Sequence, residues 1–267
     1  MKILFWNTRN NTEINTYIAS IIQDYDIDIS VLAEYKADNQ ELLQQIRKKQ
    51  RRMEFYTTIG CDRITILGNY RNVEPATQNK YYSIQIIDKK YILCGLHLPS
   101  DLHGDNENER KSIIRLIIND VQAEENKMLG QNTIIVGDFN EMPYAEGCLG
   151  ADTFHGLPVY EDMTGRTRTV VGNEYKKYYN PMWNFFGDFT YPPGTYYYNN
   201  TKLYAPMWYI LDQFIVGQDI IPLLDKKQLK IITECSSGSL SDKNGRPNKN
   251  ISDHFPIMCG IDENKGL

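Results

Sequence analysis

The sequence predicts an α/β (α+β) protein in which mixed β-sheets carry helices on their outer faces. Short apolar or alternating runs of strand length outnumber the segments with helical spacing. Several of these runs follow one another at hairpin distance, which favours antiparallel or mixed sheets over a purely parallel one. The helical segments are amphipathic, as expected for helices that cover a sheet.

The first strand is expected at residues 2–6, where the chain opens with an apolar run. A helix follows at 12–24, because four isoleucines between positions 14 and 22 fall on one helical face. Further helices are expected at 39–50 and 107–127. The other strands are expected at 28–33, 53–58, 63–68, 81–87, 90–96, 132–137, 209–216, 228–234 and 254–259.

Residues 175–209 have an unusual composition. Of these 35 residues 14 are Phe, Trp or Tyr, against 12% aromatic residues in the whole chain. Pro192-Pro193-Gly194 marks a turn inside the segment, which has no clean helical period. Because no repeat or flexible linker interrupts the chain, we expect a single domain over 1–267 with an aromatic-rich excursion at about 150–208.

Composition argues against several classes of protein. No apolar run approaches the roughly 20 residues of a membrane helix, and the first ten residues become polar too early for a signal peptide. The five cysteines are widely spaced and form no C-x-x-C pair, which indicates reduced thiols in a cytoplasmic protein and no structural zinc. The net charge of −5 implies a small substrate, locally placed positive charge, or charge supplied by a divalent metal.

Polar side chains recur at the ends of the expected strands. Each has an ordinary explanation by itself, since Asn and Asp favour turns, charged side chains are mostly exposed, and His suits structural and catalytic roles alike. Asp212 is harder to explain, because an acid inside the apolar run WYILDQFIV needs a partner, most naturally a histidine. The residues at strand ends are Asn7, Glu34, His97, Asp138 with Asn140, and Asp253 with His254.

Together these side chains predict the hydrolysis of a phosphate ester. Carboxylates suit Mg²⁺ or Mn²⁺, which are held by one or two carboxylates together with substrate phosphate and water. A further carboxylate can activate or orient water for in-line attack, while a protonated imidazole stabilises the charge that develops on the phosphate.

The short motifs that contain these residues resemble the endonuclease/exonuclease/phosphatase superfamily, and in particular its exonuclease III-like and deoxyribonuclease-like metal-dependent phosphoesterases. GDFN at 137–140 combined with SDHFP at 252–256 is specific, and WN, AE and LHL precede them in the family order. The resemblance spans Asn7 to His254. It implies a four-layer sandwich, two packed mixed sheets flanked by helices, with a divalent-metal site at one end.

The resemblance also implies a metal site. Glu34 matches the family's metal-binding glutamate, and Asn7 and Asp253 match residues near the metal, which we expect to be Mg²⁺ or Mn²⁺. Two neighbours depart from the family pattern: Ala33 stands where relatives often have Gln, and Asn10 stands where they often have Gly.

The catalytic roles come from the same resemblance. His97 matches a residue that contacts the scissile phosphate. Asp138 matches the aspartate that orients or deprotonates the attacking water, with Asn140 helping to hold the water and the phosphate. His254 matches the phosphate-binding histidine, and Asp212 the aspartate that keeps that histidine protonated. A third departure, Gln213 where Tyr is common, concerns the substrate rather than the chemistry.

The aromatic segment suggests nucleic acid as the partner. Tyr178, Trp183, Tyr197 and Trp208 could stack the bases of single-stranded or distorted nucleic acid, and Arg63 could contact phosphate. The same aromatic side chains could instead build a small core of their own. A nuclease acting on DNA or RNA is therefore the first hypothesis. A phosphodiesterase or phosphatase for a small or lipid-linked ester is the second, and an inactive binding module is the third.

Overall fold

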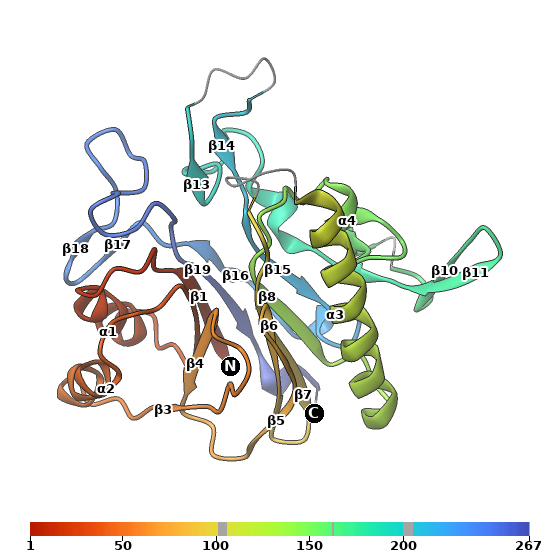
Figure 1. Ribbon diagram of the computed structural model, residues 1–267, viewed down its shortest axis with the longest axis horizontal. Coiled ribbons are helices and arrows are strands. Elements are labelled where there is room, and N and C mark those ends of the chain that lie inside the picture. Colours follow the sequence, from red (N-terminus) through yellow and green to blue (C-terminus); the bar gives the residue numbers. More distant parts are fainter. Residues whose placement is uncertain (101–105, 162, 200–204, 267) are drawn as a thin grey trace.

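The computed structural model describes residues 1–100, 106–161, 163–199 and 205–266. Two large mixed sheets pack face to face (Figure 1). Helices α1 (Asn15–Asp24) and α2 (Asn39–Lys48) cover the outer face of the first sheet, and α3 (Glu107–Met128) covers that of the second. The expected fold class, two mixed sheets flanked by helices, is confirmed.

The first sheet has the strand order β16-β19-β1-β2-β4-β3. Its central strands β1 and β2 run parallel, and its other neighbours are antiparallel. The strands are β1 (Lys2–Asn7), β2 (Ile29–Ala33), β3 (Glu54–Phe55), β4 (Ile64–Gly68), β16 (Leu224–Ile231) and β19 (Ile257–Ile261).

The second sheet has the order β5-β6-β7-β8-β15-β12-β9. Its central strands β7 and β8 are again parallel, so each sheet places two parallel strands side by side at its middle. The strands are β5 (Val73–Asn79), β6 (Tyr82–Ile87), β7 (Tyr91–His97), β8 (Thr133–Asp138), β9 (Gly156–Leu157), β12 (Tyr178–Tyr179) and β15 (Asp212–Val216).

Three apolar layers hold the four layers of secondary structure together, and strand alternation supplies them. In β1, Ile3 and Phe5 point into the core between the sheets, while Leu4 and Trp6 pack under α1 and α2. In β8, Val136 joins the core between the sheets and its neighbour Ile135 packs beneath α3. Because both faces of these strands are buried, their sequences read as continuous apolar runs.

The helices begin and end for local reasons. The Asp38 side chain accepts a hydrogen bond from the Glu41 backbone N–H over 2.7 Å and so caps the start of α2. Helix α3 lays Ile114, Ile117 and Val121 against the second sheet, and it ends where Leu129 adopts a left-handed conformation. All three expected helices are present within a few residues of their predicted bounds.

Several expected strands have different bounds in the structure. The strand expected at 53–58 is reduced to β3, and that expected at 209–216 is divided into β14 (Trp208–Tyr209) and β15. The aromatic excursion does not stand wholly apart, because β9 and β12 within it extend the second sheet. Asp212 is therefore the first residue of a strand, not an interruption in the middle of one.

Smaller elements lie around this framework. The β10–β11 hairpin projects beside α3 (Figure 1), and the β13–β14 hairpin rises at the end of the sandwich that contains the candidate site. None of the helices in the described parts of the chain is long and apolar enough to cross a membrane. The remaining elements are α4 (Glu146–Leu149), β10 (Thr167–Val170), β11 (Asn173–Lys176), β13 (Tyr196–Tyr197), β17 (Glu234–Cys235), β18 (Gly238–Ser239) and the 3₁₀ helices η2 (Pro181–Phe185), η3 (Ile221–Leu223) and η4 (Glu263–Gly266).

Candidate active site

The central strands of both sheets deliver polar side chains to one end of the sandwich. Asn7 is the last residue of β1, and Glu34 directly follows β2, its parallel neighbour. His97 and Asp138 are the last residues of β7 and β8 and are paired in register. Because the carboxyl ends of parallel strands lie at the same edge, four residues far apart in the sequence meet in one place.

One oxygen of Asp138 is the centre of this cluster. The Asn7 Nδ2 donates a hydrogen bond to Asp138 Oδ2 over 2.9 Å. The Nε2 atoms of His97 and His254 lie 3.8 and 3.9 Å from the same oxygen. The other oxygen accepts a hydrogen bond from the Asn140 backbone N–H over 2.9 Å. The Asp138 carboxylate is thus fixed in orientation and faces two imidazoles.

His254 is held from behind by Asp212. Its Nδ1 lies 2.8 Å from Asp212 Oδ2, and the Asp212 side chain is fully buried. The Trp6 Nε1 donates to the His254 carbonyl over 2.9 Å, which fixes the backbone as well. Asp212 reaches this position because β15 pairs with β8 and sets it opposite Asp138. The expectation that Asp212 has a histidine partner is confirmed.

The two histidines have opposite pKa shifts. Burial lowers the pKa of His254, but the Asp212 and Asp138 carboxylates outweigh this effect and raise it to about 10. Burial lowers the pKa of His97, and the nearby Asp138 only partly opposes it. Burial also raises the pKa of Asp138, against the influence of His254. At neutral pH the site therefore pairs a charged His254 with a neutral His97.

Glu34 presents a carboxylate to the open part of the site. Its backbone has φ 51°, a left-handed conformation that is uncommon for this residue type and that turns the side chain away from the strand direction. Asn10, also left-handed at φ 54°, donates to Glu34 Oε2 over 2.8 Å. The Glu34 side chain remains 30% exposed, and its other oxygen lies 3.6 Å from His97 Nε2. The unusual left-handed backbone conformations of Asn10 and Glu34 thus occur at the residues that position the Glu34 carboxylate.

Asp253 reaches the same cleft from the other side. Its Oδ2 lies 3.6 Å from the Arg9 Nε, which forms an ion pair across the cleft rim. The carboxylates of Glu34 and Asp253 both line the cleft, and such oxygen donors fit a hard divalent cation. The Asn7 amide nitrogen, not its oxygen, faces Glu34 and Asp138, so Asn7 holds these carboxylates in place.

A second group of potential metal ligands is less suitable. Ligand atoms of Asp138, Asp212 and His254 lie within 4.8 Å of one another. However, Asp212 is buried against Nδ1 of His254, and a close carboxylate–imidazolium pair uses the atoms that a metal would need. Glu34 and Asp253 are accessible and free of this conflict, so they are the better candidates.

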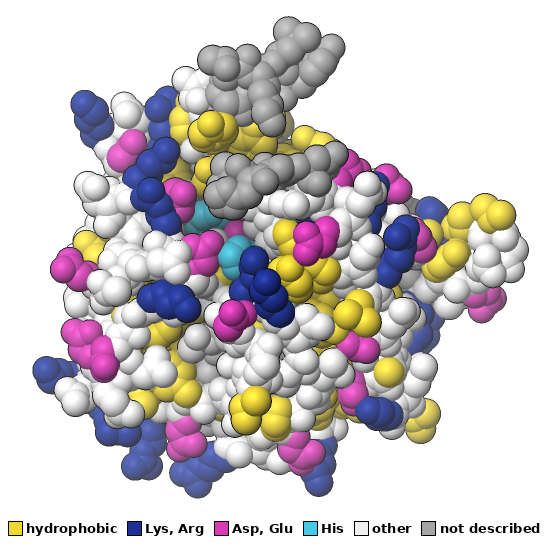
Figure 2. Space-filling model, viewed as in Figure 1, with side chains coloured by type: hydrophobic (Ala, Val, Ile, Leu, Met, Phe, Trp, Pro, Cys, Tyr) yellow, Lys and Arg dark blue, Asp and Glu magenta, His cyan; other side chains and the backbone are white. Residues whose placement is uncertain are grey.

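The cluster lies at the base of a cleft of about 810 Å³. Aromatic rings form part of its walls, and the Tyr196 ring packs on His254 with 4.8 Å between ring centroids. Figure 2 shows histidine side chains at the surface here, between acidic and basic side chains. Arg9 and Tyr144, which also line the cleft, were not predicted. The position of Tyr144 directly after the loop at 137–143 is the signal that could have indicated it.

Comparison with known proteins decides the family. A family-level sequence comparison matches residues 4–254 to the Endonuclease/Exonuclease/phosphatase family. The chain belongs to this family. Its members are metal-dependent phosphoester hydrolases, so this chain is a hydrolase that acts on phosphate esters. A search of curated proteins for sequence relatives finds no match.

Solved structures of family members share the fold. The chain resembles a 3′-5′ exonuclease from Neisseria meningitidis, with TM-score 0.60, 14% identity, and coverage of 98% of this chain and 100% of that one. It also resembles an AP endonuclease from Archaeoglobus fulgidus, with TM-score 0.58, 10% identity, and coverage of 98% and 99%. TDP2 from D. rerio, complexed with a single strand DNA product, gives TM-score 0.55 and 18% identity, with coverage of 97% of each chain.

Within the family fold, the predicted substrate-binding residues lie in different places. Tyr178 is fully buried beneath α3 and its hydroxyl donates to Glu125, so the prediction that it contacts substrate is wrong. Its ring belongs to the core because β12 extends the second sheet. Arg63 is half-buried with its guanidinium 4.7 Å from the Tyr81 ring centroid, and it lies close enough to lower the pKa of His97.

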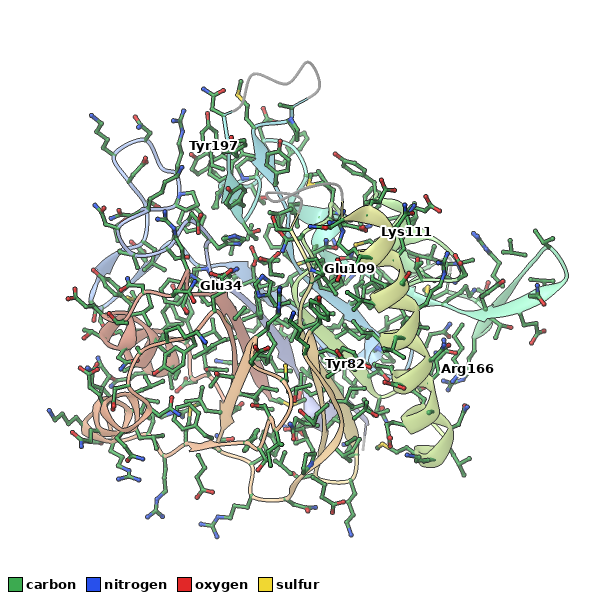
Figure 3. All side chains as sticks on the ribbon, in the orientation of Figure 1. Glu34, Tyr82, Glu109, Lys111, Arg166 and Tyr197 are labelled. Atoms are coloured by element: carbon green, nitrogen blue, oxygen red, sulfur yellow. The ribbon has the colours of Figure 1, made fainter. Side chains whose placement is uncertain are left out.

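The other three aromatic residues lie near the cleft without lining it. Trp183 packs against the cleft residue Tyr144, with 6.5 Å between ring centroids. Tyr197 and Trp208 pack on each other in the β13–β14 hairpin, 5.2 Å apart. Figure 3 shows Tyr197 on this hairpin, above the strand ends where Glu34 lies.

Gln213, where relatives commonly have Tyr, has a structural role. Its Nε2 donates to the Glu141 carbonyl over 2.6 Å, and its Oε1 accepts from Asn180 over 2.7 Å. These bonds tie the loop after Asp138 to the aromatic segment. The departure from the family pattern therefore supports the position of the loop that follows Asp138.

Proposed function

We propose that this protein is a divalent-metal-dependent nuclease that hydrolyses phosphodiester bonds in DNA or RNA. The observation that carries the proposal is the convergence of Asn7, His97 and His254 on one oxygen of Asp138, beside the accessible carboxylate of Glu34. An oriented carboxylate between two imidazoles suits the attack of water on phosphorus and the stabilisation of the charge that follows.

Asp138 acts on the attacking water. Burial raises its pKa, which makes the carboxylate a better proton acceptor than a solvated aspartate. The hydrogen bonds from Asn7 and from the Asn140 backbone leave it little freedom to rotate. Asp138 therefore directs water along one line toward the phosphorus atom.

The histidines bind the phosphate oxygens. His254 is charged at neutral pH and donates from Nε2, because its Nδ1 is engaged by Asp212. His97 is neutral and donates a second, uncharged hydrogen bond from Nε2. Charge-assisted hydrogen bonds become stronger as the phosphate gains negative charge in the transition state.

Glu34 and Asp253 would hold Mg²⁺ or Mn²⁺. Both carboxylates line the cleft, and Asn7 and Asn10 fix the orientation of Glu34. Hard cations of this kind favour oxygen ligands and retain open positions for substrate phosphate. When bound, such a cation neutralises phosphate charge and polarises the phosphate oxygens.

Two observations support nucleic acid as the substrate. Structural neighbours have been solved with DNA products: the Neisseria protein, described as a 3′ phosphatase, with a DNA hairpin, and the D. rerio TDP2 with a single strand. Aromatic side chains also lie near the cleft: Tyr197 and Trp208 on the β13–β14 hairpin, and Trp183 beside Tyr144, are candidates for stacking with bases, and Arg63 adds positive charge.

The test is a panel of substrates. Purified protein is incubated with single-stranded DNA, duplex DNA, abasic DNA, RNA and a small bis-aryl phosphodiester, with Mg²⁺, Mn²⁺ or chelator. We expect metal-dependent cleavage of nucleic acid that falls at least 100-fold in Asp138→Asn and His254→Ala. The matched control is Asp88→Asn, an exposed turn residue whose left-handed backbone Asn also adopts.

Other outcomes would identify the alternatives. Cleavage of the small ester alone would establish a phosphodiesterase or phosphatase for a small or lipid-linked substrate, which the net charge of −5 favours. If no substrate is cleaved although nucleic acid binds, the protein is an inactive binding module. Cleavage that persists equally in both catalytic variants contradicts the proposed site.

A further inference from the structure

A second pocket adjoins the catalytic cleft. It encloses about 450 Å³, within the range of roughly 300–1,000 Å³ for small-molecule sites. Tyr198 and Asp253 line both this pocket and the catalytic cleft, so the two share part of their wall. Its other walls come from the β13–β14 hairpin and from the loop at 242–250. We name it the side pocket.

Arg246 provides a flat, charged surface in the side pocket. Its guanidinium carbon lies 3.9 Å from the centre of the Tyr197 ring, and that ring is held edge-on by Trp208 at 5.2 Å. The charges of Arg246 and Asp242, which lies on the same loop, interact, but no carboxylate of the described residues is close enough to this guanidinium to form an ion pair with it. The planar cation is supported on one face by Tyr197.

The loop that carries Arg246 is ordered by its own hydrogen bonds. The Asp242 side chain accepts from the backbone N–H groups of Asn244 and Arg246 over 2.7 and 3.0 Å. The Asp242 backbone N–H in turn donates to the Arg246 carbonyl over 2.7 Å. Tyr191 from the aromatic segment donates to the Gly245 carbonyl over 3.2 Å. The guanidinium is thus positioned before any ligand arrives, which lowers the entropic cost of binding.

Amide, cationic and acidic residues complete the side pocket, and the acidic ones are Asp242 and Asp253. Asn248 and Asn250 line it, and carboxamides offer the donors and acceptors that match the edge of a nucleobase. Lys249 is exposed at the rim, and its carbonyl accepts a hydrogen bond from the Arg9 guanidinium over 2.7 Å. Arg9 lines the catalytic cleft and also pairs with Asp253, so Lys249 and Arg9 place two basic side chains near the junction of the side pocket and the cleft.

We infer that the side pocket is a nucleotide subsite that binds one unpaired base of the substrate strand beside the scissile phosphate. The base stacks on the Arg246 guanidinium, the asparagine amides contact its edge, and Lys249 binds the neighbouring phosphate. A base inside a duplex has both faces covered by its neighbours and cannot stack on Arg246. The substrate is therefore single-stranded, or has an unpaired end. This inference rests on the proposed nuclease function and specifies its substrate class.

The test measures binding separately from cleavage. Fluorescence anisotropy with labelled single-stranded and duplex DNA of the same sequence is measured on the Asp138→Asn protein, in which we expect cleavage to be at least 100-fold slower. We expect Arg246→Gln to weaken single-strand binding by about 5- to 150-fold, as for the loss of one stacked base. Arg246→Lys keeps the charge but loses the planar surface, so its single-strand binding should be weakened nearly as much. Arg47→Gln, an exposed arginine on α2, carries the same charge change and should bind as the parent protein does.

Kinetics on otherwise unmodified protein give a second readout. Arg246→Gln should raise KM for a single-stranded oligonucleotide far more than it changes kcat, because the subsite binds substrate away from the reacting atoms. If single-strand binding is unchanged in both Arg246 variants, or if Arg47→Gln weakens it equally, the subsite is refuted while the nuclease function stands. If neither form of DNA binds and no nucleic acid is cleaved, both proposals fail.

Discussion

Substitution of Asp212 by Asn tests the electrostatic design of the site. The change keeps the shape of the side chain and removes only its charge. Asp212 Oδ2 lies 2.8 Å from His254 Nδ1 and is fully buried, so no solvent replaces the lost charge. The asparagine oxygen can still accept the Nδ1 hydrogen bond. The main consequence is therefore a change in the protonation of His254.

The size of the change follows from the geometry. Two unit charges 2.8 Å apart interact by about 6 kcal/mol at an effective dielectric constant of about 20. This equals roughly 4 pKa units, so the pKa of His254 should fall from about 10 to about 6. At pH 8 about 1% of the imidazole would then be charged. We therefore expect kcat/KM to fall by roughly 100-fold at pH 8 and by much less at pH 6.

The assay is the pH profile of cleavage for the parent and Asp212→Asn proteins, with Asp88→Asn as the control for an exposed aspartate. Nuclear magnetic resonance of the labelled imidazoles reports the charge of His254 directly. A ratio of the two activities that stays constant between pH 6 and pH 9 would refute the reasoning. So would a His254 that remains charged at pH 8 in the variant.

Three further predictions concern stability. The raised pKa of His254 stabilises the metal-free protein fully below pH 6.5, and this stabilisation should be lost as the pH rises toward about 10. Urea unfolding at pH 6 and at pH 10 should show the decrease in the free energy of unfolding. The decrease should be smaller in His254→Gln. Trp6→Phe leaves the buried His254 carbonyl without its donor and should cost about 1–3 kcal/mol in urea unfolding; a cost near zero contradicts the role of this bond. Gly137→Ala puts a methyl group 2.0 Å from the Leu96 carbonyl, so it should lower both Tm and activity, and a fully active, stable variant would show that β8 can shift.

The strand ends could be predicted from the sequence because the signal there is local. In β1 and β8 an unbroken apolar run stops at a polar residue, and burial on both faces explains the run. Asn7 and Asp138 can therefore be recognised as strand-end residues from the sequence alone. The partner of Asp212 could also be predicted, since a buried acid needs a nearby hydrogen-bond donor or cation.

Which tyrosine side chains are buried and which are exposed could not be predicted in the same way. Tyr178 and Tyr198 occupy similar aromatic runs, yet Tyr178 is fully buried and Tyr198 is 43% exposed. The difference arises from α3, which supplies Glu125 and covers one run only. Contacts between segments this far apart leave no pattern in either run. Arg9 was missed for a related reason, since its partner Asp253 lies near the other end of the sequence although the two side chains are only 3.6 Å apart.

The pairing of β1 with β19 has a consequence for synthesis of the protein. The Ser252 hydroxyl donates to the Asn7 carbonyl over 2.7 Å although 245 residues separate them. His254 stands beside Asp138 only when β19 has joined the edge of β1. During translation β19 is made after the other described strands of the two sheets. The contact between His254 and Asp138 therefore forms only once β19 has been synthesised and has paired with β1.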